Sequence, residues 1–383
     1  MAMLYFNGAV DDQWETLGNW WTDSDCTSPA ASLPTSNDDV FIMANCLALP
    51  PMGVTVANME TNSHMANGGG TLTVLGSLVV NDSSGLGFLK DFYAHDVTVY
   101  GSSYLNCTAI IIDGVATFYD FSQNFGPLEG TAVFNHYASN AGSISGDATF
   151  NDQSILYGSV NEIATFNDYS AATYTSVSNA TFNDFSAVND YGSATDSTFN
   201  DYSILGAAGG TCYGYGSITF NDNSSLGNAS ADTNSNVTFN NNTYSYYYSY
   251  LGGAATFNDV SVNYTTVNGY ATFNNYSSCQ GGTLFSSCEF NDYSSCSYAS
   301  LSQYGGAATF SDHATASNTI MYGPATFNDN SHMPGANDYW STLYINGPIP
   351  ISVTSAGSYP YSAWMAFVRA GLGVNGSNIL GII

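Results

Sequence analysis

The chain has almost no cations. Lys90 and Arg369 are its only Lys or Arg residues, against 30 acidic residues. Proteins that bind nucleic acids or anionic membranes neutralise phosphate with basic side chains, so both classes of partner are excluded. Charged residues make up only 8% of the chain, which does not fit the acid-coated surface of halophilic proteins. Disorder is excluded as well, because 44% hydrophobic and 15% aromatic residues can bury a core.

Residues that favour helices are also scarce. Only five of the acids are Glu, whereas Gly, Asn, Ser, Thr and Tyr are abundant, and this composition favours strands and tight turns. No apolar run reaches the ~18 residues that a membrane-spanning helix needs, so we expect no membrane span. The segment Met1–Phe6 has neither a basic region nor a long apolar region, so we expect no signal peptide. The seven Cys are too few and too scattered for a disulfide scaffold.

A repeated motif, ATFND and its variants, runs from residue 116 to residue 329. Successive copies are 16 to 21 residues apart. Val80 and Val99 stand in the same phase upstream, so the repeat begins near residue 71. The phenylalanines of the motif are Phe118, Phe134, Phe150, Phe166, Phe182, Phe199, Phe220, Phe239, Phe257, Phe273, Phe290, Phe310 and Phe327.

The motif alternates as a β-strand does. The Ala two positions before Phe, the Phe itself and the Ser four positions after it share one parity, and we expect them to point inward. The neighbouring Thr and Asn should point outward. Gly often stands four positions before Phe, where a corner needs a permissive backbone. A period of 16 residues is too short for helical hairpins and fits one coil of a β-solenoid.

The sequence therefore predicts an all-β protein, a parallel β-solenoid of ~16–20-residue coils in which Phe stacks on Phe. Two-sided and three-sided coils both fit this length. All five Trp lie outside the repeat, and solenoid ends need covering because they expose unpaired strand edges. We predict an N-terminal capping or attachment region at 1–70, the solenoid at 71–333, and a C-terminal cap or oligomerisation segment at 334–383.

The N-terminal region resembles a known class of protein. Trp14, Asn19, Trp20, Pro34 and the run 38–42 (DDVFI), followed by 69–74 (GGTLTV), are similar to the opening segment of parallel β-solenoid surface proteins, the bacterial adhesins and the fibres of phages and viruses. The resemblance covers about 80 residues, and the later coils resemble the class more loosely. It implies a structural role on a virion or a cell surface, and it implies no catalytic residues.

An Asp two positions after Phe forms a column in which Asp152, Asp168, Asp184 and Asp201 are consecutive. Stacked coils place these carboxylates about 5 Å apart with no cation between them. The column has two interpretations. Each Asp either accepts a hydrogen bond from the N–H of the Ser two residues later, as in an Asx-turn, or helps to hold a structural Ca²⁺ between coils.

The expected outward residues form candidate binding surfaces. Thr and Asn columns on one sheet face are represented by Thr149, Asn151, Thr165, Asn167, Thr181 and Asn183. Such an array fits a plain solvated face, contact with a glycan or a neighbouring copy, or ice binding. Tyr246, Tyr247 and Tyr248 form an aromatic cluster in one loop, and exposed aromatic rings are a usual contact surface for sugars and proteins.

Two cysteine pairs are candidates for disulfides. Cys279 and Cys296 each lie six residues after a motif Phe in consecutive coils, so they should stack, either bridged or reduced. Cys26 and Cys46 are the second pair. Enzyme chemistry is poorly represented, because the five His are scattered and a carboxylate repeated in every coil is not a unique site. We expect a non-enzymatic virion protein (a fibre, spike or decoration protein) that forms homo-oligomers and contacts glycans, with a cell-surface adhesin or filament subunit as the alternative.

Overall fold

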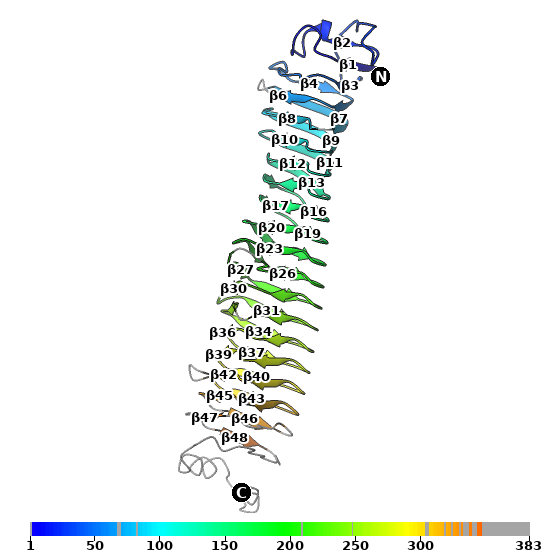
Figure 1. Ribbon diagram of the computed structural model, residues 1–383. Coiled ribbons are helices and arrows are strands. Elements are labelled where there is room, and N and C mark those ends of the chain that lie inside the picture. The colour runs from blue at the N-terminus through cyan, green and yellow to red at the C-terminus, as the bar shows by residue number, and fades with distance from the viewer. Residues whose placement is uncertain are drawn as a thin grey trace, which may run out of the picture. The chain divides into compact units, whose positions relative to one another are not determined.

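The structure is a computed structural model that describes residues 2–66, 70–81, 83–207, 210–246, 248–302, 306–317, 319–322, 325–328, 331, 337–338 and 343–346. Tyr247 and nearly all of the predicted C-terminal segment 334–383 lie outside the described residues. The chain divides into two compact units, unit 1 with residues 1–181 and 185–187 and unit 2 with residues 182–184 and 188–383. Each unit is a parallel β-solenoid, and together they contain about 15 turns (Figure 1). The predicted all-β solenoid fold is confirmed.

Unit 1 begins with short elements at its N-terminal end. These elements are β1 (Met3–Phe6), η1 (Leu17–Asn19), β2 (Trp20–Trp21), β3 (Asp39–Ile42), β4 (Val54–Val56) and β5 (Asn58–Thr61). The face that carries the motif Phe, here called the Phe face, continues with β7 (Thr71–Val80), β9 (Asp91–Val99), β11 (Ile110–Phe118), β13 (Leu128–Phe134), β16 (Ala148–Phe150), β19 (Ala164–Phe166) and β22 (Ala180–Phe182). A second sheet holds β6 (His64–Ala66), β8 (Gly85–Gly87), β10 (Tyr104–Asn106), β12 (Gln123–Asn124), β14 (Ser139–Asn140), β17 (Ile155–Leu156) and β20 (Ala171–Thr173). The third side of the later coils is formed by β15 (Ser143–Ile144), β18 (Ser159–Val160) and β21 (Ser176–Ser178).

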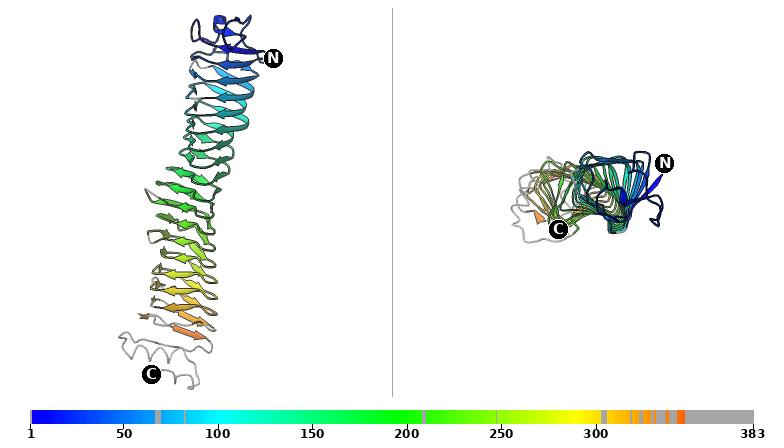
Figure 2. Two further views of the ribbon diagram at one scale, coloured as in Figure 1. Left: turned by 45° about the vertical axis from the view of Figure 1, so that its right-hand side comes forward. Right: turned by 90° about the horizontal axis from the view of Figure 1, so that it is seen from above.

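Unit 2 repeats this arrangement with three separate sides (Figure 2). Its Phe face consists of β25 (Thr198–Phe199), β28 (Ser217–Phe220), β31 (Asn236–Phe239), β34 (Ala254–Phe257), β37 (Ala271–Phe273), β40 (Cys288–Phe290), β43 (Ala308–Phe310), β46 (Ala325–Asn328) and β48 (Leu343–Asn346). The second sheet consists of β23 (Ala187–Asn189), β26 (Ile204–Leu205), β29 (Ser225–Leu226), β32 (Tyr244–Ser245), β35 (Val262–Asn263), β38 (Ser278–Gln280), β41 (Ser295–Ser297) and β44 (Thr315–Ser317). The third consists of β24 (Ser193–Thr195), β27 (Cys212–Tyr215), β30 (Ala229–Ala231), β33 (Tyr250–Leu251), β36 (Thr266–Val267), β39 (Thr283–Leu284), β42 (Ser300–Leu301), β45 (Ile320–Met321) and β47 (Asn337–Asp338).

The motif Phe form a continuous ladder within each unit, as predicted. Phe134 stacks on Phe150 with ring centroids 4.9 Å apart and planes 5° apart, and Phe239 stacks on Phe257 at 4.7 Å and 2°. These rings are fully buried. The ladder stays in register where coils are longer, because Phe199 still pairs with Phe220 although 21 residues separate them in the sequence. The extra residues are therefore accommodated outside the Phe face.

The corner glycines do not all share the cause that was expected. A positive φ is found at Gly130 (φ 133°), but Gly269 does not have one. A Cβ added to Gly269 would lie 2.2 Å from the carbonyl oxygen of Gly253 in the preceding coil. The prediction of a permissive backbone is therefore wrong for Gly269, where glycine is needed because two coils approach closely.

The parallel register extends upstream of residue 71. β3 pairs with β1 and with β5, and β5 pairs with β7. On its other edge β1 pairs antiparallel with β2 at Tyr5 and Phe6. Trp14 and Trp20 are buried beside this pair, and the indole N–H of Trp20 donates to the carbonyl of Trp14 over 2.8 Å. An antiparallel strand and two indole rings thus cover this strand edge and the first part of the core.

Candidate functional site: the turn ridge

Most motif strands of the Phe face end in the same turn. In the coil that contains Phe150, the N–H of Ser154 donates to the carbonyl of Asn151 over 3.1 Å, which closes a β-turn around Asp152. Asp152 has a φ of 58°, in the left-handed region that Asp and Asn tolerate better than most residues. The turn is confirmed, but the predicted hydrogen bond is not, because the Ser N–H bonds to the Asn carbonyl instead of the Asp carboxylate.

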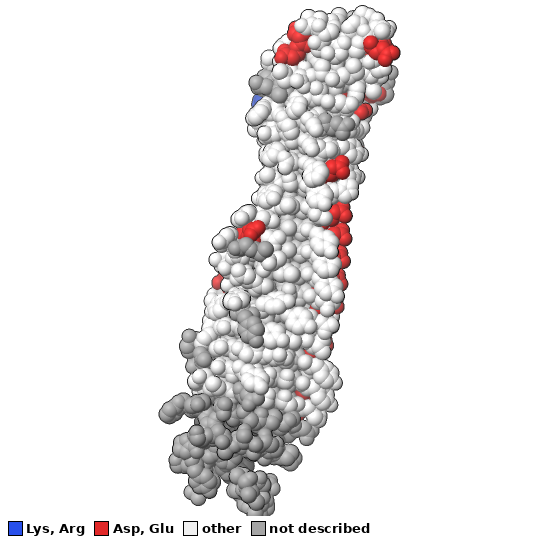
Figure 3. Space-filling model, in the orientation of Figure 1, with Lys and Arg blue, Asp and Glu red and all other residues white. Residues whose placement is uncertain are grey.

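The predicted Asp column lies on these turns in both units. Asp152 and Asp168 in unit 1, and Asp184 and Asp201 in unit 2, are all exposed and have φ between 55° and 58°. Figure 3 shows a row of acidic side chains along one edge of the coils, besides others elsewhere on this face. In the described part of the chain, no group of three or more His, Cys, Asp or Glu is arranged to hold a metal ion. The positive φ accounts for Asp at these positions, and calcium binding stays a prediction.

Where another residue replaces Asp in the column, it bonds to an Asp of a neighbouring coil. The side-chain amide of Asn241 donates to Asp222 over 2.9 Å, and that of Asn275 donates to Asp259 over 3.1 Å. In unit 1, Nδ1 of His136 lies 3.4 Å from Oδ1 of Asp120. Each replacement supplies a donor in a row of acceptors, and this offsets repulsion between the carboxylates.

A second column, which the sequence analysis missed, stands directly beside the Asp column. The residue after each Asp is often an exposed aromatic, and neighbouring rings stack face to face. Phe121 and Tyr137 stack at 5.1 Å, as do Tyr276 and Tyr293 at 5.2 Å. The pattern Phe-Asn-Asp-Tyr-Ser contains the signal. We call the two columns together the turn ridge.

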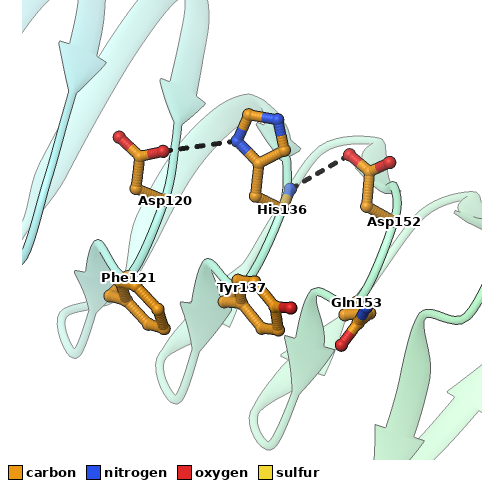
Figure 4. A pocket seen from close by; sticks show the side chains of 6 residues that line it. All are labelled: Asp120, Phe121, His136, Tyr137, Asp152 and Gln153. Carbon is orange, nitrogen blue, oxygen red and sulfur yellow. Dashed lines mark hydrogen bonds and ion pairs between the residues drawn. The ribbon is translucent and has the colours of Figure 1, made fainter.

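The turn ridge of unit 1 has a hollow of about 400 Å³. The six lining residues form two rows, with the acidic row on one side and the aromatic row on the other (Figure 4). The acidic row consists of Asp120, His136 and Asp152, and the second row consists of Phe121, Tyr137 and Gln153. The row is fixed from both sides of His136, because its backbone N–H donates to Asp152 over 3.1 Å while its ring faces Asp120.

The Asn of the motif do not form a free surface. Within each unit the Nδ2 of one Asn donates to the Oδ1 of the Asn one coil earlier: Asn167 to Asn151 over 2.8 Å, and Asn200 to Asn183 over 2.9 Å. The ladder uses one donor and one acceptor of each carboxamide, and each carboxamide has two of each. These candidate binding residues are thus first of all structural.

The Thr column stands beside the Asn ladder as expected. Thr149, Thr165 and Thr181 are half-buried, and Thr149 pairs in register with Thr165. The loop tyrosines lie elsewhere, in unit 2, where the exposed fraction of Tyr246 is 50% and that of Tyr248 is 87%. Neither group lines the hollow of the turn ridge.

The cysteines are free thiols, six of them buried. Cys279 and Cys296 are paired in register on β38 and β41, so the predicted stacking is confirmed and the pair is reduced. Burial raises the pKa of Cys46 and of Cys107 to about 12, so both thiols are protonated near neutral pH. Cys26 and Cys46 are not bridged.

Comparison with known proteins adds no family or relative to the fold described above. No protein-family model matches it, and neither a curated protein nor a solved structure matches it. The resemblance to β-solenoid proteins is supported at the level of the fold. No helix among the described residues has the length and apolar character needed to cross a membrane.

Proposed function

We propose that this chain is a non-enzymatic structural β-solenoid of a virion, acting as a fibre, spike or decoration protein and assembling with further copies. The observation that carries the proposal is the pair of continuous ladders in each unit, one of buried Phe rings and one of Asn carboxamides. Most motif coils are joined to the next coil of the same unit through three kinds of contact: backbone hydrogen bonds, ring stacking and hydrogen bonds between side-chain amides. Such a repeat makes a stiff element suited to exposure outside a particle.

Glycan contact is part of this proposal and is assigned to two surfaces. The Thr column, with Thr149 and Thr165 in register, presents hydroxyl groups at the regular spacing of the strands. The exposed Tyr246 and Tyr248 offer apolar rings that can pack against sugars. The alternative, a cell-surface adhesin or extracellular filament subunit, uses the same surfaces.

Electron microscopy of the native assembly, with an antibody against the chain, tests the role. Labelled rods that radiate from capsids or tails are the expected result. Label on cell envelopes or along end-to-end filaments would support the alternative instead. A labelled soluble fraction with no particle or surface would contradict both.

Among the described residues two His lie beside an Asp, His95 beside Asp96 and His136 beside Asp120, and the second pair lines the hollow. A carboxylate beside an imidazole is half of a nucleophilic site, which also needs a hydroxyl or thiol within hydrogen-bond reach of the ring. The ring of His136 instead lies 6.3 Å from that of Tyr119, and its backbone N–H bonds to Asp152. The geometry supports a binding surface better than a reaction centre.

A further inference from the structure

In unit 1 the acidic row of the turn ridge lies between two stacks of aromatic rings. On one side Phe121 stacks on Tyr137 with planes 10° apart, and the exposed fractions of these residues are 61% and 50%. On the other side Tyr100 stacks on Tyr119 at 5.1 Å, and Tyr119 in turn lies against His136. Tyr100 and Tyr119 occupy positions that Asn holds in later coils, so this combination is a local departure from the repeat.

Stacking leaves particular parts of these rings open. Phe121 and Tyr137 cover one face of each other, and the position after Tyr137 in the column is Gln153 instead of a ring. The stack therefore ends at the hollow, where the second face of Tyr137 has no further ring against it in the column. A planar or cationic group can lie against such a face.

The charge of the row indicates which group fits. The side chains of Asp120 and His136 are 50% and 55% exposed, and the sequence contains no Lys or Arg between Lys90 and Arg369. The formal net charge of the chain is −28. A second copy of this chain has too few cations to neutralise the row, and bringing two such rows together would place carboxylate against carboxylate.

We propose that this hollow is a docking site for an extended, arginine-rich segment of a partner protein. A guanidinium group pairs with carboxylates through two parallel hydrogen bonds, and it also stacks on aromatic faces. Asp120 and Asp152 supply the carboxylates, and Phe121 and Tyr137 supply the rings. The inference goes beyond the structural role, because it assigns a chemical class of partner. The isolated chain should bind this partner regardless of the assembly to which it belongs.

Calorimetric titration of the full chain with an oligo-arginine peptide at physiological salt tests the proposal. The matched peptide replaces Arg by citrulline, which keeps the shape and removes the charge. We expect binding of the arginine peptide, and binding at least tenfold weaker with the citrulline peptide. Equal binding of the two peptides would overturn the role of charge.

The ring stack is tested without any change in protein charge. The double variant Phe121→Ser with Tyr137→Ser should weaken peptide binding roughly five- to tenfold, the loss expected for two exposed cation–π contacts. The matched control is Tyr157→Ser with Tyr174→Ser, which removes two exposed rings outside the ridge and should change binding less than twofold. Phe121→Leu with Tyr137→Leu keeps apolar bulk at both positions and serves if the Ser variant does not fold. If the ring variants bind the arginine peptide with the affinity of the natural protein, the net charge alone attracts the peptide, and the proposal would be wrong.

The carboxylates are tested with variants that each remove one negative charge. Asp152→Asn should weaken peptide binding several-fold, whereas Glu162→Gln, an exposed acid outside the ridge, should leave it nearly unchanged. Equal effects of the two would overturn the assignment of the site. A neutral oligosaccharide that binds more tightly than the peptide, and loses its binding in the ring variants, would identify the hollow as a glycan site instead.

Discussion

The side-chain amide of Asn258 donates from Nδ2 to Oδ1 of Asn240, the equivalent residue one coil earlier, over 2.8 Å. The Oδ1 of Asn258 accepts in turn from Asn274 over 2.9 Å. Each carboxamide in the ladder is therefore both donor and acceptor, which an Asp at the same position cannot be. The motif distinguishes Asn from Asp at adjacent positions for this reason: the first must bond along the stack, and the second must adopt a positive φ.

Replacing Asn258 by Asp should destabilise unit 2 by about 1–3 kcal/mol, because the new carboxylate loses the donor and faces the oxygen of Asn240. Hydrogen exchange of the flanking strands measures the loss. Asn234→Asp makes the same chemical change at an exposed position and should have little effect. Equal losses in the two variants would show that added charge, not the ladder, is responsible.

Truncating a ring of the Phe ladder should be more costly. Phe257 is fully buried between Phe239 and Phe273, each at 4.7 Å, so Phe257→Ala should cost about 3–5 kcal/mol through the cavity that it leaves. Chemical denaturation followed by tyrosine fluorescence reports the change. The exposed Tyr248→Ala is the matched control. A Phe257→Ala protein as stable as this control would contradict a close-packed ladder.

Asp201 has a φ of 55°, where most residues with a Cβ are strained. Asp201→Ala should be about 1 kcal/mol less stable than Asp201→Asn, since Asn tolerates this conformation and Ala does not. Asp201→Asn should be at least as stable as the natural protein because it removes one carboxylate from the column. Melting curves with and without calcium chloride separate the effect of backbone conformation from that of metal binding. If Asp201→Asn lowers the melting temperature only when calcium is present, a calcium site would be supported instead.

Native-state alkylation at pH 8 should label Cys26 and leave the buried thiols unmodified. Burial holds the pKa of Cys46 and Cys107 at about 12, so neither is a thiolate under these conditions, and neither is accessible. Cys26 is half-buried, and its pKa is raised mainly by desolvation, so its labelling should be slow. Mass spectrometry after iodoacetamide treatment gives the pattern, and all seven cysteines should react in denaturant. Labelling of Cys107 without denaturant would contradict the packing of its coil.

The N-terminal elements should lose protection in acid before the Phe ladder does. Hydrogen bonds, first from the hydroxyl of Thr35 and then from the N–H of Ala2, lower the pKa of Asp38 below its ordinary value of 3.8. A carboxyl group with a lowered folded-state pKa stabilises the fold above its unfolded pKa, and this contribution is lost as the pH falls through the folded pKa. Hydrogen exchange near β1 and β3 between pH 5 and pH 2 measures the effect. Asp38→Asn should flatten the dependence, and an unchanged profile in that variant would contradict the assignment.

The repeat predicted the fold because one motif recurs thirteen times with the same alternation of residues, so the inward Ala and Phe could be identified directly. The Asn ladder could not be predicted, since an outward Asn on a strand is equally compatible with bonding to water or to its neighbour. The aromatic column is present in the motif but was not predicted, because the sequence does not distinguish a Tyr next to a turn from one on a sheet face. The role of Gly269 depended on the distance between two coils, and spacing along one chain does not report it.

The constant spacing of 16 residues between Phe134, Phe150 and Phe166 has a consequence for inheritance. These three coils pair with one another in the same backbone register and through the same ring and amide. Loss or gain of one whole repeat during DNA replication or recombination would therefore rejoin surfaces that already fit, whereas a change of any other length would break the register. The length of this stretch can therefore change in evolution by whole coils, without a compensating change elsewhere in the chain.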